Sequence, residues 1–202
     1  MYISKIELNP ACNQVRAELG DMYQMHRTLS KAFGDDPSEY AEARCLFRVD
    51  EQGENPYILV QSRIKPEWSR LTVDSCYMVA EPMVKQFAPN LKVGQRLAFK
   101  LRANPTVKRD GKRFGLYREE EQIEWLKRKG RDNGFEVLAA FNNTEKLRAN
   151  RKPNDKEATF ASVVFEGVIR ITDPEVFSKA LESGIGSAKG FGFGLLSVAP
   201  IR

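Results

Sequence analysis

Hydrophobic and polar positions in the first half of the chain predict one helix and four strands. Residues 15–33 place apolar side chains at three- and four-residue spacing, which indicates an amphipathic helix, and a Gly-Asp-Asp-Pro sequence at 34–37 ends it. Short runs of β-type residues precede and follow this helix, and turn-forming residues separate them. The predicted order is β-α-β-β with a closing strand. The strands are residues 1–8, 44–49, 57–62 and 82–87.

The second half of the chain predicts a β-α-β-β-α-β order. Residues 96–102 alternate between apolar and basic side chains, so this strand has one basic face. Residues 118–129 form a helix that starts with acidic and ends with basic side chains, the polarity that the helix dipole favours. Asp173 and Pro174 begin a second helix, because aspartate accepts from free N–H groups and proline suits the first turn. The remaining strands are residues 136–141, 159–171 and 195–201.

Two small α+β units in series explain this pattern better than one large sheet. Pairs of strands follow the helices, whereas a parallel sheet would alternate single strands with helices. The order in the second half is ferredoxin-like. We therefore predict two tandem ferredoxin-like (RRM-like) domains, each an antiparallel sheet with helices on one face, at residues 1–90 and 95–202. A chain of 202 residues is long enough for two such cores.

The charge of the chain is distributed unevenly. Residues 1–95 carry 11 basic and 13 acidic side chains, whereas residues 96–202 carry 21 and 14. Within the basic half, residues 96–131 hold 12 basic against 5 acidic side chains, and residues 146–156 hold 5 against 1. Clustered lysine and arginine indicate a polyanionic partner such as nucleic acid, since phosphate contacts release counterions. The alternative is a solvated basic face.

Several classes of protein are disfavoured by composition. No run approaches the ~18 apolar residues of a membrane span, and residues 1–10 lack the features of a signal peptide, so a cytoplasmic protein without membrane contact is expected. Cys12, Cys45 and Cys76 form no C-x-x-C motif and read as reduced thiols. The single histidine, His26, is too few for zinc sites built on several imidazoles and disfavours Ser-His-Asp chemistry.

His26 lies at the border of the apolar face of the first helix, roughly 50° from its centre at 100° per residue. Tyr23 shares that border, and Arg27 and Lys31 continue onto the polar side. Cleavage of RNA by its own 2′-hydroxyl needs proton transfer at two oxygens and stabilisation of a charged phosphorane, which imidazole, phenol and cations can supply. The alternative is an ordinary core histidine.

Residues 184–194 contain five of the 14 glycines of the chain. Neither a Walker loop nor a G-x-G-x-x-G fingerprint fits, and the segment runs from helix to strand, opposite to a dinucleotide site. The bare backbone indicates close approach of a large flat partner, with Lys189 available for phosphate and Phe191 and Phe193 for core packing or base stacking. The alternative is a tightly packed turn.

Two basic tips complete the candidate binding surface. Residues 146–156 resemble a β-hairpin arm with basic flanks, and residues 108–113 form a second basic turn that includes Arg113; arginine forks suit phosphates and guanine edges. A disordered loop is the alternative for the arm. The acidic clusters at 35–36 and 119–121 match a helix end and a helix start, so no metal site is predicted. The arm residues proposed to bind are Arg148, Arg151, Lys152 and Lys156.

Five segments together resemble the CasE family, the precursor-RNA endoribonucleases of type I-E CRISPR systems within the RAMP superfamily. The resemblance runs from residue 1 to 201, and the LRANP motif together with the terminal glycine segment is its most specific part. It implies two tandem ferredoxin-like domains and cofactor-free, metal-independent cleavage at the 3′ base of the repeat stem-loop. The segments are YQMH at 23–26, FKLRANP at 99–105, EQIEWLKRK at 121–129, FEGV at 165–168 and GIGSAKGFGFGLLS at 184–197.

The resemblance also implies products, partners and roles. The products carry a 5′-hydroxyl and a 2′,3′-cyclic phosphate, and the enzyme keeps the mature guide RNA and joins the other subunits of the surveillance complex. The family histidine falls on His26 and the tyrosine on Tyr23, with Lys31 as a contact to the scissile phosphate, and the family hairpin arm falls on residues 148–156. From the residues themselves, we add Arg27 as a second phosphate contact and Lys189 as a further RNA contact. The competing prediction is a non-catalytic subunit of the same fold that holds a stem-loop.

Overall fold

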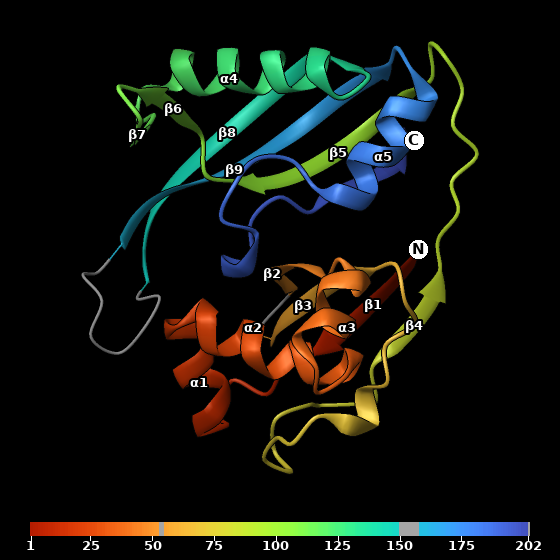
Figure 1. Cartoon of the computed structure of the whole chain (residues 1–202), viewed down its shortest axis with the longest axis vertical. Helices are drawn as coiled ribbons and strands as arrows, with labels where there is room; N and C mark the ends of the chain where they lie inside the picture. The colour runs from red at the N-terminus through yellow and green to blue at the C-terminus, as the bar shows by residue number, and fades with distance from the viewer. Residues whose placement is uncertain (53–54, 150–157, 202) are drawn as a thin grey trace. The chain divides into compact units, whose positions relative to one another are not determined.

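The structure is a computed structural model that describes residues 1–52, 55–149 and 158–201, and the chain folds as two compact units (Figure 1). Unit 1 is built from Met1–Ala88 with Gly190–Gly192 added from the C-terminal region. Unit 2 is built from Pro89–Arg148, Thr159–Lys189 and Phe193–Arg202. Both are α+β with a four-stranded antiparallel sheet, as predicted. Within the described residues, no helix is long and apolar enough to cross a membrane.

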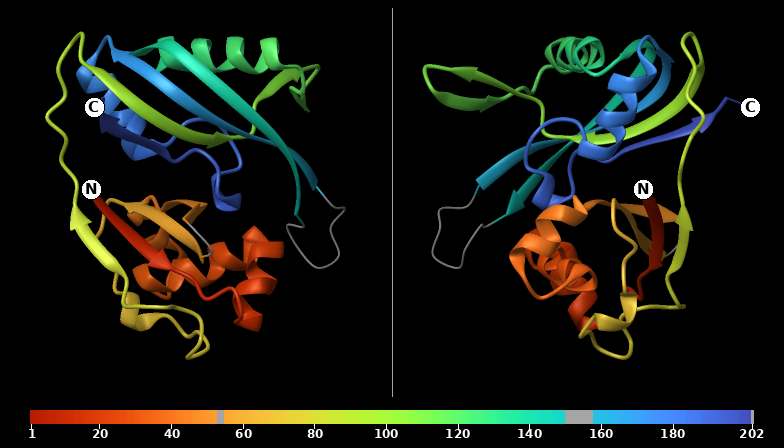
Figure 2. Two further views of the ribbon diagram at one scale, coloured as in Figure 1. Left: turned by 180° about the vertical axis from the view of Figure 1, so that it is seen from behind. Right: turned by 45° about the vertical axis from the view of Figure 1, so that its right-hand side comes forward.

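The sheet of unit 1 has the strand order β2-β3-β1-β4. β1 pairs antiparallel with both β3 and β4, so that Ser4 lies opposite Val60 on one side and Val84 on the other. This is the strand order of a ferredoxin-like unit, and the helices lie on one face of the sheet (Figure 2). The strands are β1 (Tyr2–Glu7), β2 (Leu46–Gln52), β3 (Asn55–Ser62) and β4 (Met83–Gln86).

The prediction of a single helix at residues 15–33 is wrong in one respect, because the structure divides this segment into two helices. α1 (Asn13–Gly20) and α2 (Met22–Ser30) are separate helices, and a 3₁₀ turn, η1 (Lys31–Phe33), follows α2. The break lies at Asp21, whose backbone is extended at φ −137°. Its carboxylate accepts a hydrogen bond from the Tyr23 N–H at 3.0 Å and so caps the new helix. Capping at Asp21 fixes where α2 begins and hence which way its residues face.

A further helix, α3 (Pro37–Ala43), begins where the sequence predicted only a helix end. Gly34 turns the chain at φ +133°, a conformation that favours glycine. The Asp36 carboxylate then accepts from the Ser38 N–H at 2.7 Å, and Glu39 completes a capping box with Asp36. The same Gly-Asp-Asp-Pro sequence therefore ends one helical segment and starts another.

The connection from β3 to β4 departs from the ferredoxin-like pattern. A full α-helix is expected there, but the structure places only the 3₁₀ turn η2 (Trp68–Arg70). The Trp68 side chain is buried, and its ring packs edge-on against Phe33 with centroids 6.2 Å apart. An irregular segment thus covers the part of the unit 1 core that a second helix would cover.

Unit 2 has the strand order β10-β5-β9-β8, again ferredoxin-like. The ring of Trp125 on α4 stacks on Phe165 of β9 at 6.1 Å, and Phe177 of α5 packs on Phe135 of β8 at 5.6 Å. β8 extends well beyond the predicted 136–141. The elements are β5 (Arg96–Ala103), β8 (Phe135–Ala149), β9 (Ala158–Ile171), β10 (Leu196–Pro200), α4 (Glu119–Asp132) and α5 (Pro174–Ser183).

A two-stranded hairpin, β6 (Thr106–Arg109) and β7 (Lys112–Gly115), is inserted between β5 and α4 (Figure 2). Its turn residues Asp110 and Gly111 both have positive φ, +48° and +77°, as a tight two-residue hairpin turn requires. Next to the hairpin in sequence, β5 alternates as predicted, with buried Leu97 and Leu101 on the core side. Its basic face is partly neutralised, since Lys100 pairs with Glu166 across the sheet at 3.0 Å.

Candidate active site

The helix α2 places its functional side chains at the edge of the unit 1 core. Met25 and Leu29 are fully buried, and Met22 is nearly so. His26 is half-buried, in the border position that the helical periodicity predicts, and Arg27 is exposed. The helix therefore holds an imidazole where it is anchored by the core on one side and open on the other.

Aromatic rings from several segments pack near the imidazole of His26. The ring of Tyr23 lies parallel to the imidazole, with an interplanar angle of 8° and centroids 6.3 Å apart. Phe191, from the glycine-rich segment, lies with its ring centroid 6.2 Å from that of Tyr23. Phe47 of β2 lies 6.4 Å from the imidazole centroid. These rings fix the orientation of the imidazole and shield one part of it from water.

Tyr40 makes the hydrogen bond to His26 and was missed by the sequence analysis. Its hydroxyl oxygen lies 2.7 Å from Nε2 of His26, and the two rings meet edge-on with centroids 4.9 Å apart. Tyr40 lies on α3, the helix that was not predicted. The available signal was the capping box of Asp36 and Glu39, which marks a helix start directly before Tyr40.

Burial keeps both members of this pair uncharged at neutral pH. Desolvation lowers the pKa of His26 below its usual 6.5 and raises the pKa of Tyr40 far above its usual value. The neighbouring thiol of Cys45 also raises the pKa of Tyr40, and its own pKa is raised by burial to about 12. A neutral imidazole beside a protonated phenol can accept a proton and later return it.

The glycine-rich segment brings bare backbone against the imidazole. A Cβ atom at Gly190 would lie 3.4 Å from Nε2 and Cδ2 of His26, so only hydrogen now occupies that space. Gly192 has φ +78°, and a Cβ there would lie 3.3 Å from the ring of Phe47. Of the two roles predicted for Phe191 and Phe193, core packing is the one observed, since both are buried. Tight packing thus explains much of the glycine content.

The predicted cations take different positions. Arg27 is exposed, and its guanidinium donates to the Gln24 amide oxygen at 3.4 Å. Lys31 is exposed on the 3₁₀ turn that directly follows α2. The Lys189 ammonium, assigned to unit 2, donates a short hydrogen bond to the Ser183 carbonyl. Arg27 and Lys31 therefore belong to the helical segment of His26.

Unit 2 contains a basic groove between the β6–β7 hairpin and α4. The cavity has a volume of about 470 Å³, and Trp125 and Gly186 contribute to its walls. Arg113, predicted as a binding residue, is exposed on its rim. The sequence analysis included the basic end of α4 in the block that indicates a polyanionic partner, but it did not place these side chains in one groove with Arg113. The basic residues of the groove are Lys108, Arg113, Arg128 and Lys129.

The structure describes only part of the predicted basic arm. Arg148 lies near the end of β8, and its side chain is not among those described. Arg151, Lys152 and Lys156 lie outside the described residues. Their role in binding stays a prediction from the sequence.

Three comparisons with known proteins agree. A family model for CRISPR associated proteins matches residues 1–200. The chain is 39% identical over 215 residues to the CRISPR-associated endoribonuclease Cse3 of Thermus thermophilus, covering 99% of this chain and 100% of the relative. It is 32% identical over 217 residues to the CRISPR system Cascade subunit CasE of Escherichia coli K12, covering 100% of both. The structure of Thermus thermophilus Cse3 bound to an RNA that represents a pre-cleavage complex superposes with a TM-score of 0.88, at 37% identity and 98% coverage of each chain.

Proposed function

The chain belongs to the family of CRISPR-associated proteins that contains Cse3 and CasE, and from this premise we propose that it cleaves the repeat stem-loop of precursor CRISPR RNA. The observation that carries the proposal is the half-buried, neutral imidazole of His26, held by Tyr40 and stacked on Tyr23. Arg27 and Lys31 are exposed on the same helical segment. This set supplies a proton acceptor, a phenol and two cations within one short stretch of chain.

The chemistry that fits this set is attack of a 2′-hydroxyl on the adjacent phosphate. His26 accepts the proton of the 2′-hydroxyl or donates one to the leaving 5′-oxygen, and Tyr23 assists. Lys31 and Arg27 hold the phosphate oxygens as negative charge develops on them. The products are a 2′,3′-cyclic phosphate and a 5′-hydroxyl. Protein side chains supply every proton transfer and charge in this scheme, so it proceeds without a metal ion.

The hydrogen bond between Tyr40 and His26 restricts how RNA can approach the imidazole. Its hydroxyl is hydrogen-bonded to Nε2 in the free protein, so an RNA group that exchanges a proton with the imidazole must replace it there or reach the ring at Nδ1. In either case the phenol stays protonated, because burial raises its pKa. We therefore assign Tyr40 as a positioning residue that holds the imidazole plane for the reacting group.

The basic groove of unit 2 is the proposed site for the RNA stem. Arg113 on the hairpin and Arg128 on α4 both line this groove, and guanidinium groups suit backbone phosphates. Lys189 and the arm residues Arg148, Arg151, Lys152 and Lys156 are proposed as further RNA contacts. Accordingly, we propose that residues 1–90 act as the catalytic domain and residues 95–202 as the domain that holds the stem.

Partners and place in the cell follow from the family. The Escherichia coli relative is named as a Cascade subunit, and we infer that this chain likewise retains its product RNA and assembles with the other subunits of a type I-E surveillance complex. The proposed substrate of this chain is an RNA transcript, so we propose a cytoplasmic location.

The decisive experiment is to incubate the purified protein with a labelled repeat stem-loop in EDTA. A matched RNA carries a single 2′-deoxy substitution at the 3′ base of the stem. Cleavage of the first RNA and not the second is expected. Tight binding with neither RNA cut would instead support the alternative function, a non-catalytic subunit that holds the stem-loop.

A further inference from the structure

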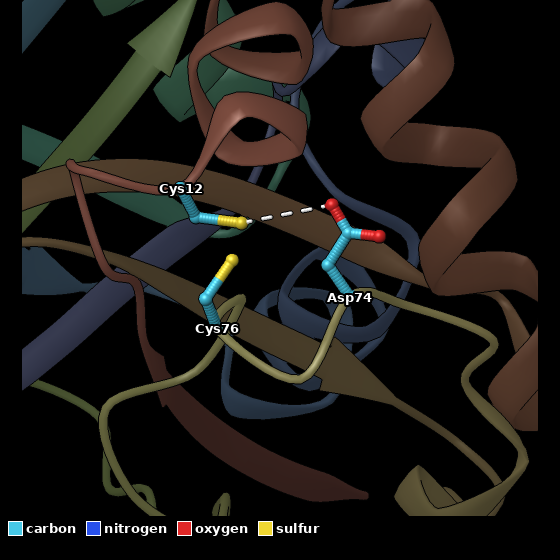
Figure 3. Close-up of side chains that lie close together, drawn as sticks. All are labelled: Cys12, Asp74 and Cys76. Carbon is cyan, nitrogen blue, oxygen red and sulfur yellow. Dashed lines mark hydrogen bonds between the residues drawn. The ribbon is translucent and has the colours of Figure 1, made fainter.

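Three potential metal ligands converge in unit 1, although they come from distant parts of the sequence (Figure 3). The thiols of Cys12 and Cys76 and a carboxylate oxygen of Asp74 all lie within 4.8 Å of one another. The Cys12 thiol points at the Asp74 carboxylate, with Sγ 3.9 Å from Oδ2. All three cysteines of the chain are free.

The segments that carry these ligands are tied together by backbone hydrogen bonds. The Asn9 N–H donates to the Tyr77 carbonyl at 3.0 Å, and the Tyr77 N–H donates to the Asp74 carbonyl at 2.9 Å. The Asp74 N–H donates to the Gln14 side-chain oxygen at 2.9 Å. Cys12 is the residue directly before α1, and its N–H donates to the Asn9 carbonyl. The protein itself therefore holds the two ligand-bearing segments side by side.

The distances between the ligand atoms are close to those of tetrahedral coordination around Zn²⁺. With Zn–S near 2.3 Å and Zn–O near 2.0–2.2 Å, a sulfur and an oxygen ligand lie about 3.5 Å apart. The observed 3.9 Å needs only a small side-chain adjustment. Thiolate is the protein ligand that selects zinc over the harder cations, and a single carboxylate is a common third ligand. Asp74 and Cys76 are exposed, which leaves room for water as the fourth ligand.

We propose that Cys12, Asp74 and Cys76 bind one Zn²⁺ ion, with water in the fourth position. Binding forms two Zn–S bonds and one Zn–O bond, and it releases the two thiol protons to solvent. The ion joins the start of α1 to the segment that precedes β4. This site goes beyond the proposed cleavage function and has no part in its proton transfers.

A buried carboxylate connects the proposed site to the helix that carries His26. Glu18 on α1 accepts hydrogen bonds from the Thr28 hydroxyl of α2 at 2.7 Å and from the Tyr77 hydroxyl at 2.6 Å. Tyr77 is fully buried and directly follows Cys76. A metal ion at Cys76 thus braces the same segment that anchors α1 against α2, so its expected effect is on the stability of unit 1.

Zinc affinity should increase with pH. Binding displaces the protons of both thiols, so protons compete with the ion.

The test uses the full-length protein, stripped of metal with a chelator and kept reduced with a phosphine. Titration with Co²⁺ should give a thiolate-to-cobalt charge-transfer band that saturates at one equivalent, and Zn²⁺ should displace it and raise the Tm. Cys76→Ser is the main variant, because this side chain is exposed and its replacement should leave the fold intact. It should lose the band, and Asp74→Asn should weaken binding at least tenfold.

Cys45→Ala is the matched control, since Cys45 is a buried thiol outside the cluster, and it should keep the band. Absence of a stoichiometric band in the reduced protein, or a band that survives Cys76→Ser, would overturn the proposal. So would a Cys12–Cys76 disulfide that re-forms under the reductant, detected as a mass lower by two hydrogens, because the thiols would then be unavailable to the ion.

Discussion

The Tyr40 hydroxyl lies 2.7 Å from Nε2 of His26, and the two residues come from different helices, α3 and α2. Because the phenol pKa is raised by burial, the hydroxyl keeps its proton and can donate it to the neutral ring nitrogen. A donor at Nε2 stabilises the neutral imidazole, in the same direction as the desolvation that lowers the pKa of His26.

Replacing Tyr40 by Phe should reduce kcat by about 2- to 10-fold, the equivalent of one neutral hydrogen bond. It should also move the acidic limb of the kcat–pH profile to higher pH, since the neutral imidazole loses its donor. RNA affinity should stay unchanged. The measurement is single-turnover cleavage across pH.

A matched control for this variant is Tyr57→Phe. Tyr57 lies on β3 in the same unit, with the Lys5 ammonium 4.8 Å from its ring centroid. If Tyr40→Phe lowers the rate without moving the pH profile, the residue supports the fold only and does not tune His26.

Replacing His26 by Ala should lower the cleavage rate on the order of 10²- to 10⁴-fold with little loss of RNA affinity. In the wild type, burial lowers the pKa of His26, so the neutral base persists below pH 6.5 and activity should fall only at more acidic pH. Cleavage rates from pH 5 to 8 and filter binding test both parts. An unchanged rate in the variant would remove His26 from the mechanism.

The same pKa shift predicts how stability depends on pH. The unfolded chain binds a proton at His26 near pH 6.5, whereas the folded chain binds it only at lower pH. The free energy of unfolding should therefore decrease as the pH falls from about 6.5 to the folded-state pKa. His26 is the only histidine, so His26→Asn should flatten this part of the curve in urea titrations. An identical slope in the variant would contradict the burial effect.

The sequence predicted the strands and both sheets better than it predicted the helices around the site. Alternation in β5 and the Asp173 cap depend on neighbouring residues, so periodicity and capping rules find them. The break at Asp21 is a local backbone change inside a continuous apolar pattern, so the hydrophobic periodicity of the sequence does not reveal it. Because α3 was not predicted from the sequence, Tyr40 was not included among the predicted site residues.

Contacts between distant segments could not be predicted in the same way. The Cys12 and Asp74 side chains are 62 residues apart in sequence, and only the packed fold brings them together. Gly190 likewise reaches His26 from the far end of the chain. In contrast, the proposed role of His26 could be inferred from the sequence, because its helical position, its chemistry and the YQMH motif of the family resemblance all lie in one short segment.

The basic groove of unit 2 predicts how the RNA affinity of the protein depends on salt concentration. If Arg113 and Arg128 each contact one phosphate, replacing either by Ala should reduce the slope of log K against log salt by about 1. Lys127→Ala is the control, since Lys127 is on the same helix but pairs with Glu124 at 2.8 Å. Binding measured at several salt concentrations gives the slopes. Equal slopes for Arg128→Ala and Lys127→Ala would place the RNA elsewhere.

Alanine substitutions at two neighbouring glycines should have different effects, one on activity and the other on stability. Ala at Gly190 meets the imidazole at 3.4 Å, an ordinary contact, so the fold should tolerate it while the methyl group competes with RNA for that edge of His26. We expect kcat to fall about tenfold or more with an unchanged Tm, because a reacting hydroxyl must come within about 3.2 Å of the base. Ala at Gly192 instead meets a backbone at φ +78° and should cost on the order of 1–2 kcal/mol of stability. Thermal unfolding and single-turnover cleavage of both variants provide the comparison, and full activity of Gly190→Ala would mean that RNA approaches the imidazole from its other edge.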